Sequence, residues 1–377
     1  MLRVTEQPLA RAGSADKFIV SEKVNSTGAA FVKAAFGSKN RNRLIDEYFS
    51  GLGLEELPAP AAWMHVYQLL LWADQSNGLA HCYESDKSQP GKNWYSRSLA
   101  FHDWLSTELA IEPAHLAERI DWLFRRATAD LAVAVMRKAA KVAADAERQR
   151  QPYEGKNFPK PGEDPELISI IRDTLGDDVI AEPAPEKWQL LVQRIRQYLA
   201  LENKRKNLVG EGFEDVLAHV IKRTCKAPTI DVHARRLLHE LPGFNRNRQG
   251  EKATKVDVAI LRGDKRTLVT AKWSVRADRE KQFAADFADY VSAESSRTPF
   301  EYVFVTNEFD PARLMRACDQ LAGNAHLFAH VVHINTEAVK AAYGVTQEPT
   351  MRRVLELIDK GRLIGLSQWL SLLDEPI

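Results

Sequence analysis

The chain has 377 residues, of which 45% are apolar and 27% charged, and its 52 basic and 51 acidic side chains give a formal net charge of +1. This composition is that of a soluble globular protein, and no apolar run approaches the roughly 20 residues that a membrane helix needs. Three separated cysteines exclude a disulfide framework, and the N-terminus lacks the apolar block of a secretory signal, so we expect a cytoplasmic protein.

The first half of the chain is dominated by helical patterns. Between residues 28 and 150, and most clearly over 99–109 and 114–148, apolar residues recur every three or four positions. This spacing, in a stretch rich in Ala, Leu, Arg and Glu, predicts amphipathic helices with one buried face, the longer stretch forming one helix or two. We therefore expect an N-terminal all-α domain over residues 1–155.

A change of composition marks the predicted boundary between two domains. Residues 149–165 read QRQPYEGKNFPKPGEDP, and their four prolines and two glycines favour a linker or an exposed loop. Within the second domain, residues 156–377, helices are predicted at 185–201, 211–222, 278–292 and 311–323, and strands at 255–261, 267–273, 302–305 and 329–334. These elements predict an α/β (α+β) fold with a mixed central β-sheet flanked by helices.

The first two predicted strands carry a pair of candidate catalytic residues. Gly263-Asp264 joins these strands and is typical of a tight hairpin turn. Asp257 interrupts the first strand and Lys272 lies near the end of the second, so a hairpin is able to bring them together. A carboxylate that holds a hard divalent cation beside a lysine that orients water suits phosphodiester hydrolysis. Taken alone, such a pair is more often simply solvent-facing.

Three charged residues follow Lys272 where the strand gives way to the next predicted helix. Arg276, Asp278 and Arg279 lie four, six and seven positions beyond it. An arginine fork reads O6 and N7 of guanine, and an aspartate accepts a hydrogen bond from N4 of cytosine. The group predicts a reader of adjacent G·C pairs in the major groove, the alternative being an ordinary charged first turn of a helix.

A further carboxylate lies on the same predicted helix. Arg279, Phe283, Asp286 and Tyr290 recur at spacings of four, three and four, which places them on one helix face. Asp286 is two turns, or roughly 10 Å, beyond Arg279. The start of this helix is thus able to contact bases while its middle supplies a metal ligand.

Together these residues resemble the PD-(D/E)XK restriction endonucleases that cut DNA sites containing CCGG. The resemblance covers residues 210–286 and no part of the N-terminal half. In that group the second acidic ligand has moved from the strand to the helix, and a small or hydroxyl residue, here Thr270, fills its place. The resemblance implies a restriction-endonuclease-like fold and the following roles: Asp257 and Asp286 as Mg²⁺ ligands with the Ala271 carbonyl, Lys272 as the catalytic lysine, and Arg276, Asp278 and Arg279 as the base-reading residues.

The resemblance also implies an upstream helical glutamate near the metal. Residues 210–217 read GEGFEDVL and open a predicted helix, in which Glu214 precedes the apolar stripe by the more suitable spacing than Glu211. We therefore predict Glu214 as a further catalytic residue and metal ligand, with an acidic first turn as the alternative for both glutamates. The chain departs from the group at Val256, where proline is common, and at Asp286, where glutamate is more frequent.

These features predict a type II restriction endonuclease. It would act on double-stranded DNA as a homodimer or a higher oligomer, making Mg²⁺-dependent double-strand breaks at a palindromic site with CCGG at its centre. The helical domain would serve dimerisation or clamp the DNA, and the absence of a GxxxxGK[ST] motif argues against a nucleotide cofactor. Two alternatives remain, a repair, resolvase or modification-dependent nuclease of the same fold and a non-catalytic DNA-binding module.

Overall fold

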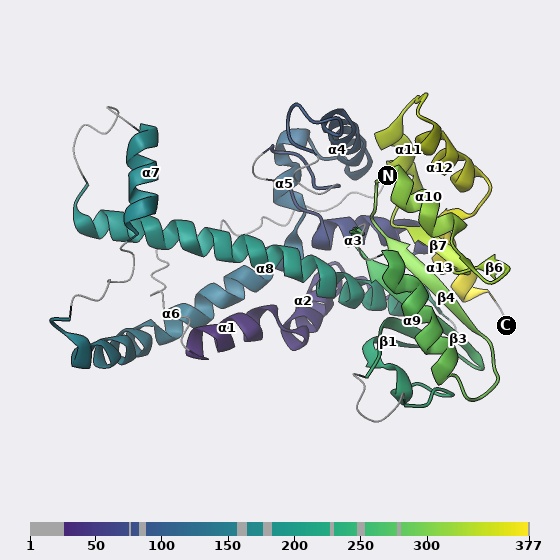
Figure 1. Cartoon of the computed structure of the whole chain (residues 1–377), viewed down its shortest axis with the longest axis horizontal. Helices are drawn as coiled ribbons and strands as arrows, with labels where there is room; N and C mark the ends of the chain where they lie inside the picture. Colours follow the sequence, from purple (N-terminus) through teal and green to yellow (C-terminus); the bar gives the residue numbers. More distant parts are fainter. Residues whose placement is uncertain are drawn as a thin grey trace. The chain divides into compact units, whose positions relative to one another are not determined.

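The computed structural model describes residues 26–74, 77–82, 88–156, 164–175, 183–226, 230–246, 253–276 and 280–375 (Figure 1). The chain divides into two compact units, each made of two stretches. The first unit comprises residues 1–37 and 127–206, and the second comprises residues 38–126 and 207–377. The predicted boundary near residue 155 falls inside the first unit, whereas the helices of residues 38–126 belong to the same unit as the sheet.

The described residues of the first unit form helices and the turns between them. These helices are α1 (Ser26–Phe36), α6 (Trp122–Arg150), η3 (Gln151–Tyr153), α7 (Pro165–Leu175) and α8 (Pro185–Thr224), with α6 beginning and α8 ending in the second unit. Both α7 and α8 start at a proline, whose fixed φ suits the first helical position. No helix within the described ranges has both the length and the apolar character needed to cross a lipid bilayer.

Helix α8 differs from the prediction of two helices, because it runs unbroken through 40 residues. Gly210 and Gly212 lie inside it. A Cβ atom at Gly212 would lie 3.4 Å from Leu123 and 3.5 Å from Leu70, which are ordinary van der Waals distances. The helix therefore continues through both glycines despite the cost of about 1 kcal/mol that a glycine imposes on a helix interior.

The second unit combines a six-stranded sheet with helices from both halves of the chain. Its further helices are α2 (Ser38–Gly51), η1 (Ala59–Ala61), α3 (Ala62–Leu70), α4 (Tyr95–Leu109), η2 (Pro113–His115), α5 (Leu116–Arg119), η5 (Leu238–Glu240), α9 (Glu280–Ala293), α10 (Pro311–Asp319), α11 (Thr336–Tyr343), α12 (Pro349–Asp359) and α13 (Leu366–Asp374). Helix α4 packs on α11, and α3 packs on α13. The pattern at residues 114–148 forms two helices, α5 and α6, separated at Asp121, whose φ is +59°.

The sheet is mixed and its strands lie in the order β1-β2-β3-β4-β7-β8. The strands are β1 (Ile230–Leu237), β2 (Lys255–Arg262), β3 (Lys265–Lys272), β4 (Phe300–Thr306), β7 (His330–His333) and β8 (Leu363–Gly365). The pairs β1–β2 and β2–β3 are antiparallel, and the three pairs from β3 to β8 are parallel. The predicted α/β class, with a mixed sheet and flanking helices, is confirmed.

Individual elements confirm and correct the sequence predictions. The hairpin is present, with Arg262 paired to Lys265 and Gly263 at a φ of +56°. Strands β1 and β8 were not predicted. The first six residues of β1, IDVHAR, do alternate apolar and polar side chains, whereas β8 has only three residues. The predicted helix at 311–323 ends at Asp319. The chain then forms a separate hairpin of β5 (Leu321–Ala322) and β6 (Ala325–His326), turned by Gly323 at a φ of +63°.

Helix α9 covers one face of the sheet at β4 (Figure 1). The rings of Phe283 and Phe304 pack at a tilt with centroids 5.1 Å apart, and Tyr290 meets Tyr302 edge-on at 5.5 Å. Each buried aromatic side chain contributes roughly 1.5–3 kcal/mol relative to an exposed one. Since Asp286 shares the helix face of Phe283 and Tyr290, this packing holds Asp286 toward the sheet.

Candidate active site

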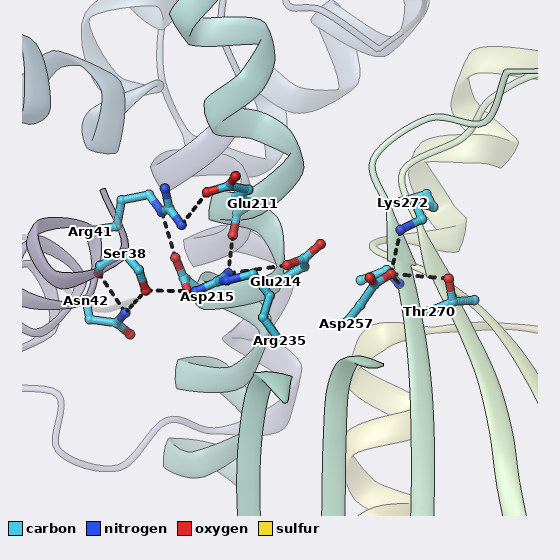
Figure 2. Close-up of polar contacts among 11 residues, drawn as sticks. Ser38, Arg41, Asn42, Glu211, Glu214, Asp215, Arg235, Asp257, Thr270 and Lys272 are labelled. Carbon is cyan, nitrogen blue, oxygen red and sulfur yellow. Dashed lines mark hydrogen bonds and ion pairs between the residues drawn. The ribbon is translucent and has the colours of Figure 1, made fainter. Parts of the chain in front are cut away.

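Asp257 and Lys272 meet on the hairpin of β2 and β3, as the sequence predicted. Oδ2 of Asp257 accepts hydrogen bonds from Nζ of Lys272 at 2.6 Å, from the backbone N–H of Ala271 at 2.9 Å and from Oγ1 of Thr270 at 3.2 Å (Figure 2). The antiparallel register, with Val258 opposite Val269, brings this stretch of β3 beside Asp257. Both charged side chains are thus held on rigid strands.

Glu214 approaches this pair from helix α8. Its side chain points from the helix toward Asp257 (Figure 2), and the residue is only 9% exposed. Burial and then the charge of Asp257 raise the pKa of Glu214 to about 8, while Lys272 and Arg235 act in the opposite direction. Glu211 is instead exposed at 63% of its side chain and lies 2.9 Å from Arg41. Of the two candidate upstream acids, Glu214 is therefore the one directed at the hairpin.

Asp286 is a third carboxylate on which the charges of Asp257 and Lys272 act. It lies half-buried on α9, and burial raises its pKa, with Lys272 opposing and Asp257 adding to the shift. The charges of Asp257 and Lys272 thus act on both Glu214 and Asp286, although these residues come from different helices. The predicted catalytic residues form one electrostatic cluster.

The donor chemistry of this cluster suits Mg²⁺. Among the described residues, no group of three or more His, Cys, Asp or Glu side chains is close enough to form a complete protein-made metal site. Mg²⁺ does not require one, because it commonly binds one or two carboxylates and completes its shell with water and phosphate oxygens. A cation would also stabilise carboxylates whose ionisation is opposed by burial and by one another. Asp257 with Glu214 or Asp286 therefore fits the ion, and the Ala271 carbonyl stays a predicted ligand.

Arg235 is a site residue that the sequence did not reveal. It lies in β1 between Ala234 and Arg236, which pair with Val258 and Val256, so it faces Asp257 across the strands. Its guanidinium donates to the Glu214 carboxylate at 3.3 Å and also to Asp215. Its φ of +53° is left-handed, which costs an L-residue roughly 1–2 kcal/mol. No sequence signal marks an arginine in this conformation within an irregular strand.

Asp215, the residue after Glu214 on α8, holds the Arg235 guanidinium in place. Its carboxylate is fully buried and accepts from Nε of Arg41 at 2.7 Å as well as from Arg235. Arg235 further donates to Oγ of Ser38 at 2.8 Å and to the carbonyl of Glu211 at 3.0 Å (Figure 2). Helices α2 and α8 and strand β1 are therefore fixed together directly behind Glu214.

The first of the predicted base-reading residues, Arg276, lies just beyond β3. Arg276 is exposed, in the segment that leaves the strand after Lys272. Asp278 and Arg279 lie outside the described residues. Trp273, between Lys272 and Arg276, is buried and packs edge-on against Phe213 of α8 at 5.4 Å.

Comparisons with known proteins do not place this chain in a family. No protein family matches it, and no curated protein matches it. The residues themselves, above all the carboxylates around Lys272, are thus the basis for assigning a function.

Proposed function

We propose that this chain is a Mg²⁺-dependent endonuclease that cuts both strands of duplex DNA. The observation that carries the proposal is the contact of 2.6 Å between Lys272 and Asp257 at the end of the hairpin, with the carboxylates of Glu214 and Asp286 in the same electrostatic cluster. A lysine among acids that are able to hold a divalent cation is the arrangement that phosphodiester hydrolysis needs. The mixed sheet flanked by helices is compatible with a restriction-endonuclease-like fold.

The side chains divide the work of hydrolysis among them. A bound Mg²⁺ would polarise the phosphate and lower the pKa of its water. Lys272 orients the attacking water and favours its deprotonated form, since its ammonium stabilises negative charge beside the phosphate. The water oxygen bonds to phosphorus as the bond to the 3′ oxygen breaks, and a proton passes to that oxygen. The products are a 5′-phosphate and a 3′-hydroxyl.

Asp257 and its neighbours keep the reacting groups in place. Asp257 holds the Lys272 ammonium through Oδ2, while Arg235 directs Glu214 to the same side. Both contacts fix side chains in the positions that the reaction needs before DNA binds, which is how preorganised sites lower a barrier.

We further propose a type II restriction endonuclease acting as a homodimer at a palindrome containing CCGG. The support is the spacing of Arg276, Asp278 and Arg279 after Lys272, with Asp286 as a carboxylate borrowed from the helix. Arginine and aspartate are the side chains that read guanine and cytosine edges. The helical first unit would contribute to dimerisation or clamp the DNA outside the site.

Digestion of unmodified plasmid DNA tests the proposal. The purified chain should give discrete fragments with Mg²⁺ and none with EDTA, and sequencing of the fragment ends should place CCGG at each cut. Asp257→Asn should abolish cutting and Lys272→Met should slow it at least about a hundredfold, while Lys265→Met, at the opposite end of β3, should cut as the wild type does.

Other outcomes distinguish the alternatives. Cutting confined to branched or methylated DNA would indicate a resolvase, repair or modification-dependent nuclease of the same fold. Binding of duplex DNA without cutting at any Mg²⁺ concentration, unchanged by Asp257→Asn, would indicate a DNA-binding module and overturn the enzymatic proposal.

A further inference from the structure

A second buried polar cluster lies at the end of β4, behind the segment that leaves β3. Thr306 and Asn307 are fully buried and Glu308 is 4% exposed. The proposed hydrolysis uses none of the three. Because burying polar groups is costly unless they are hydrogen-bonded, their partners indicate what the cluster does.

The cluster holds the backbone between Lys272 and Arg276. The backbone N–H of Asn307 donates to the carbonyl of Trp273 at 3.0 Å. The backbone N–H of Val275 donates to Oε2 of Glu308 at 2.8 Å. Trp273 and Val275 are thus both fixed, and the exposed Arg276 follows directly after this held backbone.

Glu308 is suited to this role because all its partners are donors. Oε1 accepts from the backbone N–H groups of Phe309 at 3.0 Å and Asp310 at 2.8 Å. Oε2 accepts from Val275 and from Nη1 of Arg313 at 3.2 Å. Only a carboxylate is able to accept at both ends, since an amide would turn its NH₂ group toward one pair of donors.

The cluster is also tied into the protein core. Oδ1 of Asn307 accepts a hydrogen bond from the hydroxyl of Tyr67 on α3 at 2.8 Å. The ring of Tyr67 in turn meets Trp273 edge-on at 6.3 Å. The segment after β3 is therefore held from β4 and from α3, so a shift of Arg276 relative to Lys272 would require this network to break.

We infer that Glu308 is a specificity-positioning residue. By holding the N–H of Val275, it sets where Arg276 meets the base edges relative to the phosphate at Lys272. This inference rests on the proposed nuclease function and goes beyond it, because Glu308 is buried and acts through the backbone of the segment that carries Arg276.

The test compares two matched glutamates. Glu294 lies beyond the opposite end of the strand pair. It accepts from two backbone N–H groups, those of Ser296 and Arg297, where Glu308 accepts from three, and it also accepts from an arginine, Arg266. Glu308→Gln and Glu294→Gln are each compared with the wild type. The substrates are synthetic duplexes that carry the site mapped by plasmid digestion, intact or with one base pair changed.

Both variants should lose similar thermal stability, but only Glu308→Gln should lose discrimination. The ratio of kcat/KM for the intact over the altered site should fall by about tenfold, as expected when one arginine–guanine contact is misplaced. Should Glu308→Gln fail to fold, Glu308→Asp serves, since it keeps the charge but draws back from Val275 and should lower the same ratio. An unchanged ratio in the folded Glu308 variant, or an equal fall in Glu294→Gln, would overturn the inference. A wild type that cuts no duplex would overturn the proposed function itself.

Discussion

Glu214 on α8 and Asp257 on β2 are two carboxylates directed at one another from different elements (Figure 2). Burial first, and then the charge of Asp257, raise the pKa of Glu214 to about 8, and the nearby Lys272 and Arg235 do not cancel the shift. Ionisation of the Glu214 carboxyl group is therefore less favourable in the folded chain than in the unfolded chain. A cation between these acids would remove much of that cost.

The thermal stability of the metal-free protein should reflect this shift. Glu214 has a pKa of about 8 in the folded chain and an ordinary value of 4.5 when unfolded, so between these pH values the folded state holds a proton that the unfolded state releases. The contribution to stability is full below the ordinary pKa and is lost as pH rises through the folded pKa.

In EDTA, the Tm of the wild type should fall relative to that of Glu214→Gln as pH is raised. The exposed Glu211→Gln is the control and should follow the wild type. If the Tm of wild type and of Glu214→Gln changed with pH in parallel, the raised pKa of Glu214 would be contradicted.

Mg²⁺ should stabilise the protein without DNA. A ligand that binds only the folded state at ten times its Kd adds about 1.4 kcal/mol. We expect Mg²⁺ to raise the Tm of the wild type near pH 8 and to leave that of Asp257→Asn unchanged, because the central carboxylate is lost. Differential scanning calorimetry at several Mg²⁺ concentrations measures the effect. An equal rise in both proteins would show that the ion binds elsewhere.

Replacing Arg235 should lower the free energy of unfolding more than replacing its neighbour Arg236. Arg235→Ala leaves the fully buried Asp215 with Arg41 as its remaining arginine partner. Breaking a buried pair costs about 3–5 kcal/mol, and we expect the lower end because the Arg235 side chain is 22% exposed. Denaturant unfolding measures the loss. Arg236→Ala, at a side chain 48% exposed, is the matched control and should change stability by about 0.5 kcal/mol or less.

The left-handed backbone at Arg235 allows a sharper comparison. Glycine adopts a φ of +53° without strain, so Arg235→Gly should be more stable than Arg235→Ala by about 1 kcal/mol. Both variants lack the guanidinium, and the difference therefore isolates the backbone. Equal stabilities would mean that the backbone relaxes once the arginine is removed.

Lys272→Met should separate chemistry from binding. Loss of a positioned group that assists proton transfer lowers rates by about a hundredfold to ten-thousandfold. We expect a fall of that size in single-turnover cleavage, with duplex binding in Ca²⁺ or EDTA close to that of the wild type. Lys265→Met provides the control on the same strand. A variant that cuts at the wild-type rate would remove Lys272 from the mechanism.

Local patterns predicted the hairpin and its pair of Asp257 and Lys272, because the turn at Gly263-Asp264 and the interruption at Asp257 are short-range signals. Sequence spacing also placed Asp286 on the buried face of α9, next to Phe283 and Tyr290. The sequence did not predict the side chains that hold Glu214 in place. Arg41, Asp215 and Arg235 come from three separate elements, and their contacts depend on how α2, α8 and β1 pack together.

The same reason explains why the polar cluster at Glu308 was not anticipated. In the sequence, Thr306, Asn307 and Glu308 are ordinary loop residues after a strand. Their function depends on the parallel pairing of β3 with β4, which sets Lys272 beside Thr306. Parallel neighbours are joined by long connections, so the register between them leaves no local signal.

Arg276→Lys should reduce discrimination between sites more than affinity. Lysine keeps the positive charge but lacks the fork that bonds O6 and N7 of guanine together. The preference for the mapped site over a duplex with one altered G·C pair should therefore fall by about tenfold. The dependence of binding on salt should remain that of the wild type, because the number of neutralised phosphates is unchanged. Arg236→Lys, on an exposed part of β1, should alter neither quantity. A weaker salt dependence without loss of discrimination would instead assign Arg276 to a phosphate.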